Sequence, residues 1–87
     1  MKLRTNSVSW REIDGETVIL DLSSSTYLKT NAAGSTIMRL LAEERTTTEL
    51  ADGLVEAYGI PADQAKADTE TFIAMLRERN LLDTADS

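Results

Sequence analysis

Asp14-Gly15-Glu16-Thr17-Val18-Ile19-Leu20-Asp21-Leu22 is the stretch that decides the fold. Asp followed by Gly favours a tight hairpin turn, because both residues tolerate a positive φ angle. The segment Val18-Ile19-Leu20-Asp21-Leu22 after this turn is mostly apolar and begins with two β-branched residues, which is typical of a strand. We therefore expect a strand over residues 16–22 that pairs with a preceding strand over residues 7–13. A polar turn at residues 23–25 leads to a third strand that begins at Thr26.

The register of this first hairpin has two solutions. A two-residue loop places Trp10 opposite Ile19. A loop one residue longer places Trp10 opposite Leu20, and Val8 then lies opposite Leu22. We favour the longer loop, because it gathers the apolar side chains on a cleaner face.

Helical periodicity begins after Asn31, which is a good N-cap for a first helix over residues 32–43. Thr46 and Glu49 have the spacing of a capping box. They begin a second helix that runs to about Tyr58 and ends at the glycine that follows. Its apolar face predicts that Leu50, Leu54 and Tyr58 are buried.

The third helix begins after Pro61 and runs over residues 62–79. Leu81 and Leu82 then fold back onto the core. Met75 lies on the shoulder of the apolar stripe of this helix, where it either fills the edge of the core or faces a partner. The stripe consists of Ala65, Thr69, Phe72, Ile73 and Leu76.

These elements predict an α+β fold in which a three-stranded antiparallel sheet precedes three helices, in a winged helix-turn-helix-like arrangement. At this length we expect a single domain over residues 1–87, ordered over about residues 7–82. Three short strands cannot cover their own edges, and an unpaired edge is a template for another chain. We expect Trp10 to anchor the core, whereas Tyr27 fits either the core or an exposed groove.

The composition argues against several classes of partner. The net charge is −6, with nine basic and fifteen acidic residues. A nucleic-acid-binding protein needs a basic face, and the cations here are scattered, so nucleic acid is not an expected partner. The N-terminal residues 1–6 have no apolar signal region, and no stretch reaches the ~20 apolar residues of a membrane span. We expect a cytoplasmic protein that does not enter a membrane.

Catalysis lacks its usual residues. The chain has no Cys and no His, which removes the thiolate nucleophile and the commonest general base and metal ligand. Ser23-Ser24-Ser25 offers hydroxyls without a base and indicates a turn. The many carboxylates on the helices have the pattern of a solvated face. We therefore expect no enzyme activity, no catalytic residue, no metal site and no cofactor.

The ordered set of motifs resembles the PqqD-like proteins, which are also called RiPP precursor peptide recognition elements. The resemblance covers about Val8 to Leu82, nearly the whole chain. No single piece is specific, but the order and the spacing together are. The pieces are Val8-x-Trp10, Val18-Ile19-Leu20-Asp21-Leu22, Tyr27-Leu28-Lys29-Thr30-Asn31-Ala32-Ala33-Gly34, Ile37-x-x-Leu40-Leu41, Thr46-Thr47-x-Glu49-Leu50, Leu54-x-x-x-Tyr58, Asp68-x-x-x-Phe72-Ile73-x-x-Leu76 and Leu81-Leu82.

The resemblance implies that the protein binds the leader segment of a ribosomally synthesised precursor peptide and presents it to a modifying enzyme. In the family the leader adds as an antiparallel strand to the third strand, in the groove against the third helix. Carried over to this chain, the resemblance implies a peptide-binding set of Thr26, Tyr27, Leu28, Lys29, Thr30, Asp68, Phe72, Met75 and Arg79.

The size and acidity of the chain make it most similar to the stand-alone recognition protein of lasso-peptide clusters. That similarity implies a separate leader peptidase of the transglutaminase-like class as partner. One alternative is a PqqD-type chaperone that presents a precursor peptide to a radical enzyme. Others are a small adaptor or antitoxin, and a winged-helix DNA-binding regulator. The regulator needs a basic recognition helix, yet residues 49–58 contain Asp52 and Glu56 and neither Lys nor Arg.

Overall fold

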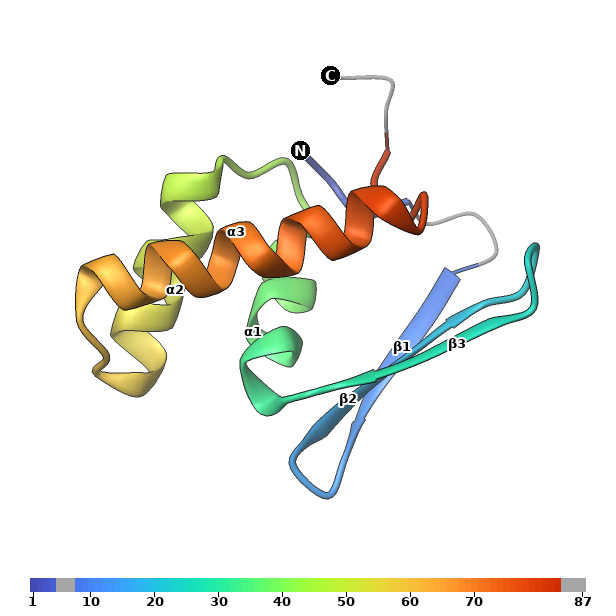
Figure 1. Ribbon diagram of the computed structural model, residues 1–87, viewed down its shortest axis with the longest axis horizontal. Helices are drawn as coiled ribbons and strands as arrows, with labels where there is room; N and C mark the ends of the chain where they lie inside the picture. Colours follow the sequence, from blue (N-terminus) through green and yellow to red (C-terminus); the bar gives the residue numbers. More distant parts are fainter. Residues whose placement is uncertain (5–7, 84–87) are drawn as a thin grey trace.

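The computed structural model of the chain describes residues 1–4 and 8–83. The predicted α+β order is confirmed, with a twisted sheet on one side of the molecule and the helices on the other (Figure 1). Ser7, where we expected the first strand to begin, lies outside the described residues. The elements are β1 (Val8–Ile13), β2 (Glu16–Asp21), β3 (Thr26–Thr30), α1 (Ala32–Leu40), α2 (Thr47–Tyr58) and α3 (Ala62–Glu78).

The sheet is antiparallel with the order β1-β2-β3, so β2 is central and β3 is an edge strand. Trp10 lies opposite Ile19, which shows that the hairpin has the two-residue loop and that our preference for the longer loop was wrong. The reason is the turn itself, because Asp14 and Gly15 have φ angles of 52° and 79°. Two positive φ angles define a tight turn whose twist matches the strands, and this outweighs the apolar pattern.

One face of the sheet packs on the helices. Ile19 on β2 belongs to the core, and its strand partners Trp10 and Leu28 pack against the same cluster. Trp10 is nevertheless only half-buried, so it borders the core instead of anchoring it. Tyr27 points to the opposite face, because successive side chains alternate across a strand, and it is 58% exposed.

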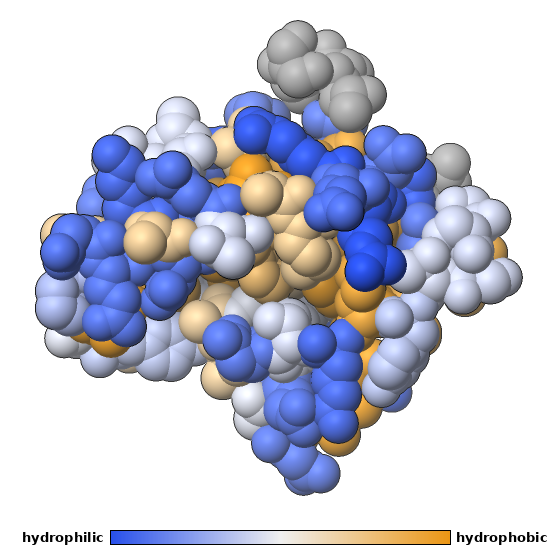
Figure 2. Space-filling view, viewed as in Figure 1, coloured by the Kyte–Doolittle hydropathy of each residue, from blue (hydrophilic) through white to orange (hydrophobic). Residues whose placement is uncertain are grey.

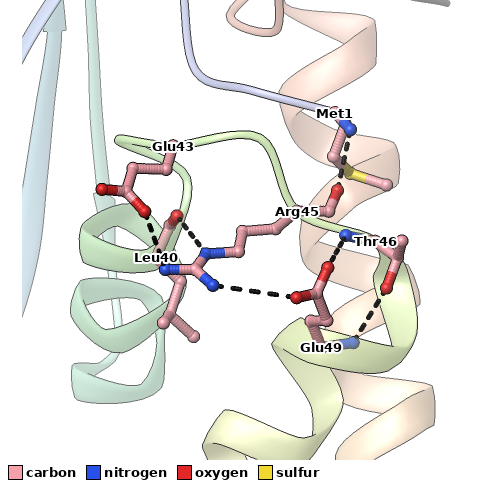
Figure 3. A network of polar contacts seen from close by, with 6 residues as sticks. All are labelled: Met1, Leu40, Glu43, Arg45, Thr46 and Glu49. Carbon is pink, nitrogen blue, oxygen red and sulfur yellow. Dashed lines mark hydrogen bonds and ion pairs between the residues drawn. The ribbon is translucent and has the colours of Figure 1, made fainter.

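The turn between α1 and α2 is organised by Arg45 (Figure 3). Its Nε donates to the carbonyl of Leu40 at 3.2 Å, and its guanidinium also pairs with Glu43 and Glu49. The amides of Ala42 and Glu43 bond three residues back instead of four, so α1 ends at Leu40 and not at residue 43 as expected. The predicted capping box is confirmed, since Thr46 and Glu49 exchange hydrogen bonds of 2.9 and 3.1 Å.

The α3 stripe is buried as predicted, and all five of its residues face the core. The return of Leu81 and Leu82 to the core is also confirmed, and Leu82 pairs with Leu3 in an isolated β-bridge. Burial of Leu50 and Leu54 is correct, but Tyr58 is 45% exposed. Its hydroxyl donates to the carbonyl of Ala32 at 3.0 Å, and this bond holds the ring at the surface. None of the helices within the described residues is both long and apolar enough to cross a membrane.

Candidate functional site: a pocket at the end of β3

A pocket of about 300 Å³ opens where β3 ends and α1 begins, and α3 forms its opposite wall. Figure 2 shows hydrophobic surface between α3 and the strands, with hydrophilic residues on both sides. The pocket lies between α1 and α3 because these two helices pack on α2, and α1 also on β2, with little contact between α1 and α3 themselves. Its lining consists of Thr30, Asn31, Ala33, Gly34, Ile37, Leu54, Asp68, Thr71, Phe72 and Met75.

The structure brings four residues of the predicted set together in this pocket. Thr30 contributes the last position of β3, and Asp68, Phe72 and Met75 contribute one face of α3. Met75 is half-buried and also packs against the core, so it both fills the edge of the core and faces the pocket. Phe72 is 8% exposed and belongs to the core as well as to the pocket wall.

The other five predicted residues lie outside the pocket lining. Thr26 and Leu28 are half-buried on the helix-facing side of β3. Tyr27 and Lys29 are exposed on the opposite face, where Lys29 pairs with Glu16 at 3.3 Å. Arg79 is exposed at the C-cap of α3. The predicted set is therefore a strand that leads to a pocket, not one contiguous cavity.

A buried hydrogen-bond network fixes the junction of β3 and α1 beside the pocket. The Thr17 hydroxyl donates to the carbonyl of Asn31 at 2.8 Å, and the Ser35 hydroxyl lies 2.5 Å from it. Because a hydroxyl has one proton to donate, Ser35 is the donor to Thr17. Thr17 and Ser35 are fully buried, and the side chain of Asn31 caps α1 by accepting from the Gly34 amide. The backbone of residues 30–35 is thereby held in place.

Sequence reasoning missed six pocket residues. The apolar floor comes from Ile37 and Leu54, which belong to different helices and cannot be assigned to one pocket from periodicity. Gly34 did carry a signal, because a glycine inside a helix usually has a packing or functional reason. The others are Asn31, Ala33 and Thr71.

The lining of the pocket is mostly apolar and uncharged. Asp68 is the one ionisable residue in the lining, which is otherwise apolar or neutral. No group of His, Cys, Asp or Glu residues within the described part of the chain is placed to hold a metal ion.

The carboxylates with clearly shifted pKa values serve the fold. The hydrogen bond from the Ser23 hydroxyl is the main cause that lowers the pKa of Asp21 below its usual range, supported by Ser24 and Arg4. The Thr46 amide lowers the pKa of Glu49 as part of the capping box. An acid–base catalyst needs a pKa shifted toward neutrality, and these two shifts run the other way.

The comparisons with known proteins match this architecture. Residues 16–82 match the family described as coenzyme PQQ synthesis protein D (PqqD), and the chain therefore belongs to the PqqD family. A search of curated proteins found no match. The structure is similar to one described as TbiB1 in complex with the TbiA(beta) leader peptide, with a TM-score of 0.80 and 31% identity over 97% of this chain and 96% of that chain.

A second solved structure supports the fold. It is described as lasso peptide synthetase B1 complexed with the leader peptide, and its TM-score is 0.73. The two chains are 24% identical, and the similarity covers 92% of this chain and 93% of that chain.

Proposed function

We propose that this protein binds the leader segment of a ribosomally synthesised precursor peptide and presents it to a separate leader peptidase in lasso-peptide biosynthesis. The observation that carries the proposal is that the edge strand β3 runs directly into the pocket between α1 and α3. A peptide strand alongside β3 would gain main-chain hydrogen bonds, and the pocket would read its side chains. The similarity to a solved complex of TbiB1 with a leader peptide supports the same function.

The register of the sheet indicates which amides of β3 would accept the leader. Ile13 and Glu16 flank the two-residue turn as a hydrogen-bonded pair. Such pairs alternate along antiparallel strands, so the amide of Leu28 faces β2. The amides of Tyr27 and Lys29 then face the free edge, where a leader strand would pair with them.

Side-chain alternation assigns the leader residues to two faces. Residues opposite each other in an antiparallel pair point to the same face. Leader residues opposite Leu28 and Thr30 would therefore point toward the helices, where one apolar or aromatic anchor enters the pocket against Phe72 and Met75. Residues opposite Tyr27 and Lys29 would point to the other face and tolerate substitution.

The chain supplies recognition, and in this proposal the chemistry belongs to the partner peptidase of the transglutaminase-like class. The similar structure with 31% identity is described as TbiB1 in complex with a leader peptide, and the second is described as lasso peptide synthetase B1 complexed with the leader peptide. We therefore favour this assignment over presentation to a radical enzyme. A DNA-binding role is disfavoured, because α2 carries Asp52 and Glu56 without a cation.

The test is binding of the TbiA(beta) leader peptide, and of the leader of any short precursor peptide that is found encoded beside this gene. Hydrogen exchange should slow at Tyr27 and Lys29 when leader is added, while the edge amides of β1 stay unchanged. A proline at a pairing position of the leader should abolish binding. Protection on α2 with residues 26–30 unchanged would contradict strand addition, and no affinity for either leader would contradict the proposed function.

A further inference from the structure

Gly34 lies in the pocket wall, where a larger residue would fit only if a neighbouring group moved. It lies in the first turn of α1 and is buried. A Cβ atom at this position would lie 2.8 Å from Cε2 of Phe72 and 2.9 Å from Cγ2 of Thr30. These separations are shorter than van der Waals contact, so one of the neighbouring groups would have to move.

The surroundings determine which group moves. The backbone on the α1 side is held by the network of Thr17, Asn31 and Ser35. The backbone on the α3 side is held by the buried residues Ile73 and Leu76, which follow Phe72. The clashing atoms are the ends of the Phe72 and Thr30 side chains, and both residues line the pocket. A displaced ring or methyl group would therefore occupy space that the pocket now provides.

We propose that Gly34 is a positioning residue that sets the width of the leader pocket, so that the pocket selects one large apolar or aromatic leader side chain. This inference rests on the proposed function, which it makes specific. The volume of about 300 Å³ lies at the lower end of ligand pockets, which suits one large side chain. The apolar walls from Ile37, Leu54 and Phe72 determine its chemical class.

The chain contains a matched control for this idea. Gly53 is also a helical glycine, and a Cβ atom there would lie 2.6 Å from Cδ1 of Leu40. Leu40 does not line the pocket. Gly34→Ala and Gly53→Ala therefore share the gain in helix propensity and a close contact with a side-chain end, and they differ in whether that contact borders the pocket.

The test measures the affinity of both variants for two forms of the TbiA(beta) leader peptide. One is the native form, and the other carries Ala in place of its anchor, which an alanine scan against the wild-type protein identifies as the apolar or aromatic residue with the largest loss of affinity. Gly34→Ala should weaken binding of the native leader by about tenfold or more, which corresponds to about 1.4 kcal/mol. Binding of the Ala-anchored leader should change by less than about twofold, and Gly53→Ala should leave both affinities unchanged. Phe72→Leu, added to Gly34→Ala, should restore part of the affinity because it removes the displaced ring.

An equal loss of affinity for both leaders, or an equal loss in both glycine variants, would overturn the proposal.

A second readout needs no leader. Phe72 and Met75 are neighbours three positions apart on α3, so the ¹³C-methyl signal of Met75 should respond to the ring position. That signal should shift in Gly34→Ala and stay in place in Gly53→Ala, and an unchanged signal in both would also overturn the positioning role. A shifted signal in a protein that binds no leader would instead contradict the proposed function alone.

Discussion

β1 and β3 are the two edge strands of one sheet, yet their helix-facing sides differ. β1 lies against α1, where Glu12 pairs with Arg39 at 3.4 Å and Trp10 packs on the core. β3 ends at an open pocket whose far wall is α3. An unpaired edge supplies main-chain hydrogen bonds to any strand, but only an edge beside a pocket can also select side chains. The predictions below test whether this difference makes β3 the binding edge.

The largest effect is expected from Phe72→Ala, because Phe72 belongs to both the core and the pocket. Truncation of a buried Phe costs about 3–5 kcal/mol of unfolding free energy, and the 8% exposure of Phe72 places this site near the lower end. Leader affinity should fall in the same variant. Urea denaturation would measure the stability and calorimetry the affinity. A variant that keeps its stability would show that the ring is not part of the core.

The comparison of the two edges is tested directly by proline substitutions. Lys29→Pro removes an amide that faces the free edge and adds a ring in the path of the leader, while edge positions tolerate proline. Leader affinity should fall by about a hundredfold, or about 2.7 kcal/mol. Glu12→Pro makes the same change on the free edge of β1 and should leave affinity unchanged.

Lys29→Ala is the control for the loss of charge at position 29 and should retain most of the affinity. If Glu12→Pro weakened leader binding as strongly as Lys29→Pro, the leader would not distinguish the two edges. The proposal that β3 is the binding edge would then be wrong.

Met75→Ala separates the pocket from the core. Met75 is half-buried, so its truncation should lower the melting temperature by less than that of Phe72. Its contacts in the pocket should still contribute about tenfold in leader affinity. Thermal unfolding and fluorescence anisotropy would measure the two effects. A loss of stability equal to that of Phe72→Ala would place Met75 in the core alone.

The part of this site on α3 was predictable, because one helix carries both the core stripe and the pocket residues at a fixed period. Phe72 and Met75 follow from that local pattern. The pocket as a whole was not predictable, since Gly34 and Leu54 meet α3 only after separate helices pack. The hairpin register was missed because the φ angles of Asp14 and Gly15, which periodicity does not report, decide it. Tyr58 was misassigned because its hydroxyl reaches a main-chain carbonyl on another helix.

The two ends of β3 are held by different groups, and only one of these groups includes an ionised side chain. The pH dependence of the melting temperature should therefore report on that end. The end beside the pocket depends on the neutral hydroxyls of Thr17 and Ser35. The other end follows a turn held by Asp21, which accepts from Ser23 and Ser24 and pairs with Arg4 at 2.8 Å. These partners lower the pKa of Asp21 below the ordinary value of 3.8, with the Ser23 hydroxyl as the main cause.

The direction of that shift fixes the pH dependence. The ionised Asp21 stabilises the fold above pH 3.8, and its contribution is lost as the pH falls through the lower pKa of the folded state. The melting temperature of the wild type should therefore fall more steeply below about pH 4 than that of Asp21→Asn. Asp52→Asn, an exposed carboxylate on α2, should follow the wild type. If the melting temperatures of the wild type and Asp21→Asn fell in parallel as the pH was lowered, ionised Asp21 would not stabilise the fold in this way.

The smallest effect is expected from salt. Lys29 is exposed on the outer face of β3 and Arg79 at the C-cap of α3, and exposed charges contribute little because water and ions screen them. If the leader is acidic near either residue, raising the ionic strength should weaken binding by only a few-fold. Lys29→Ala and Arg79→Ala should reduce that dependence, whereas Arg11→Ala, a cation on β1, should leave it unchanged. The pocket lining contains no cation. A loss of most of the leader affinity at high ionic strength would therefore show that charged residues outside the pocket supply the binding energy. The pocket that distinguishes β3 from β1 would then not be the main binding site.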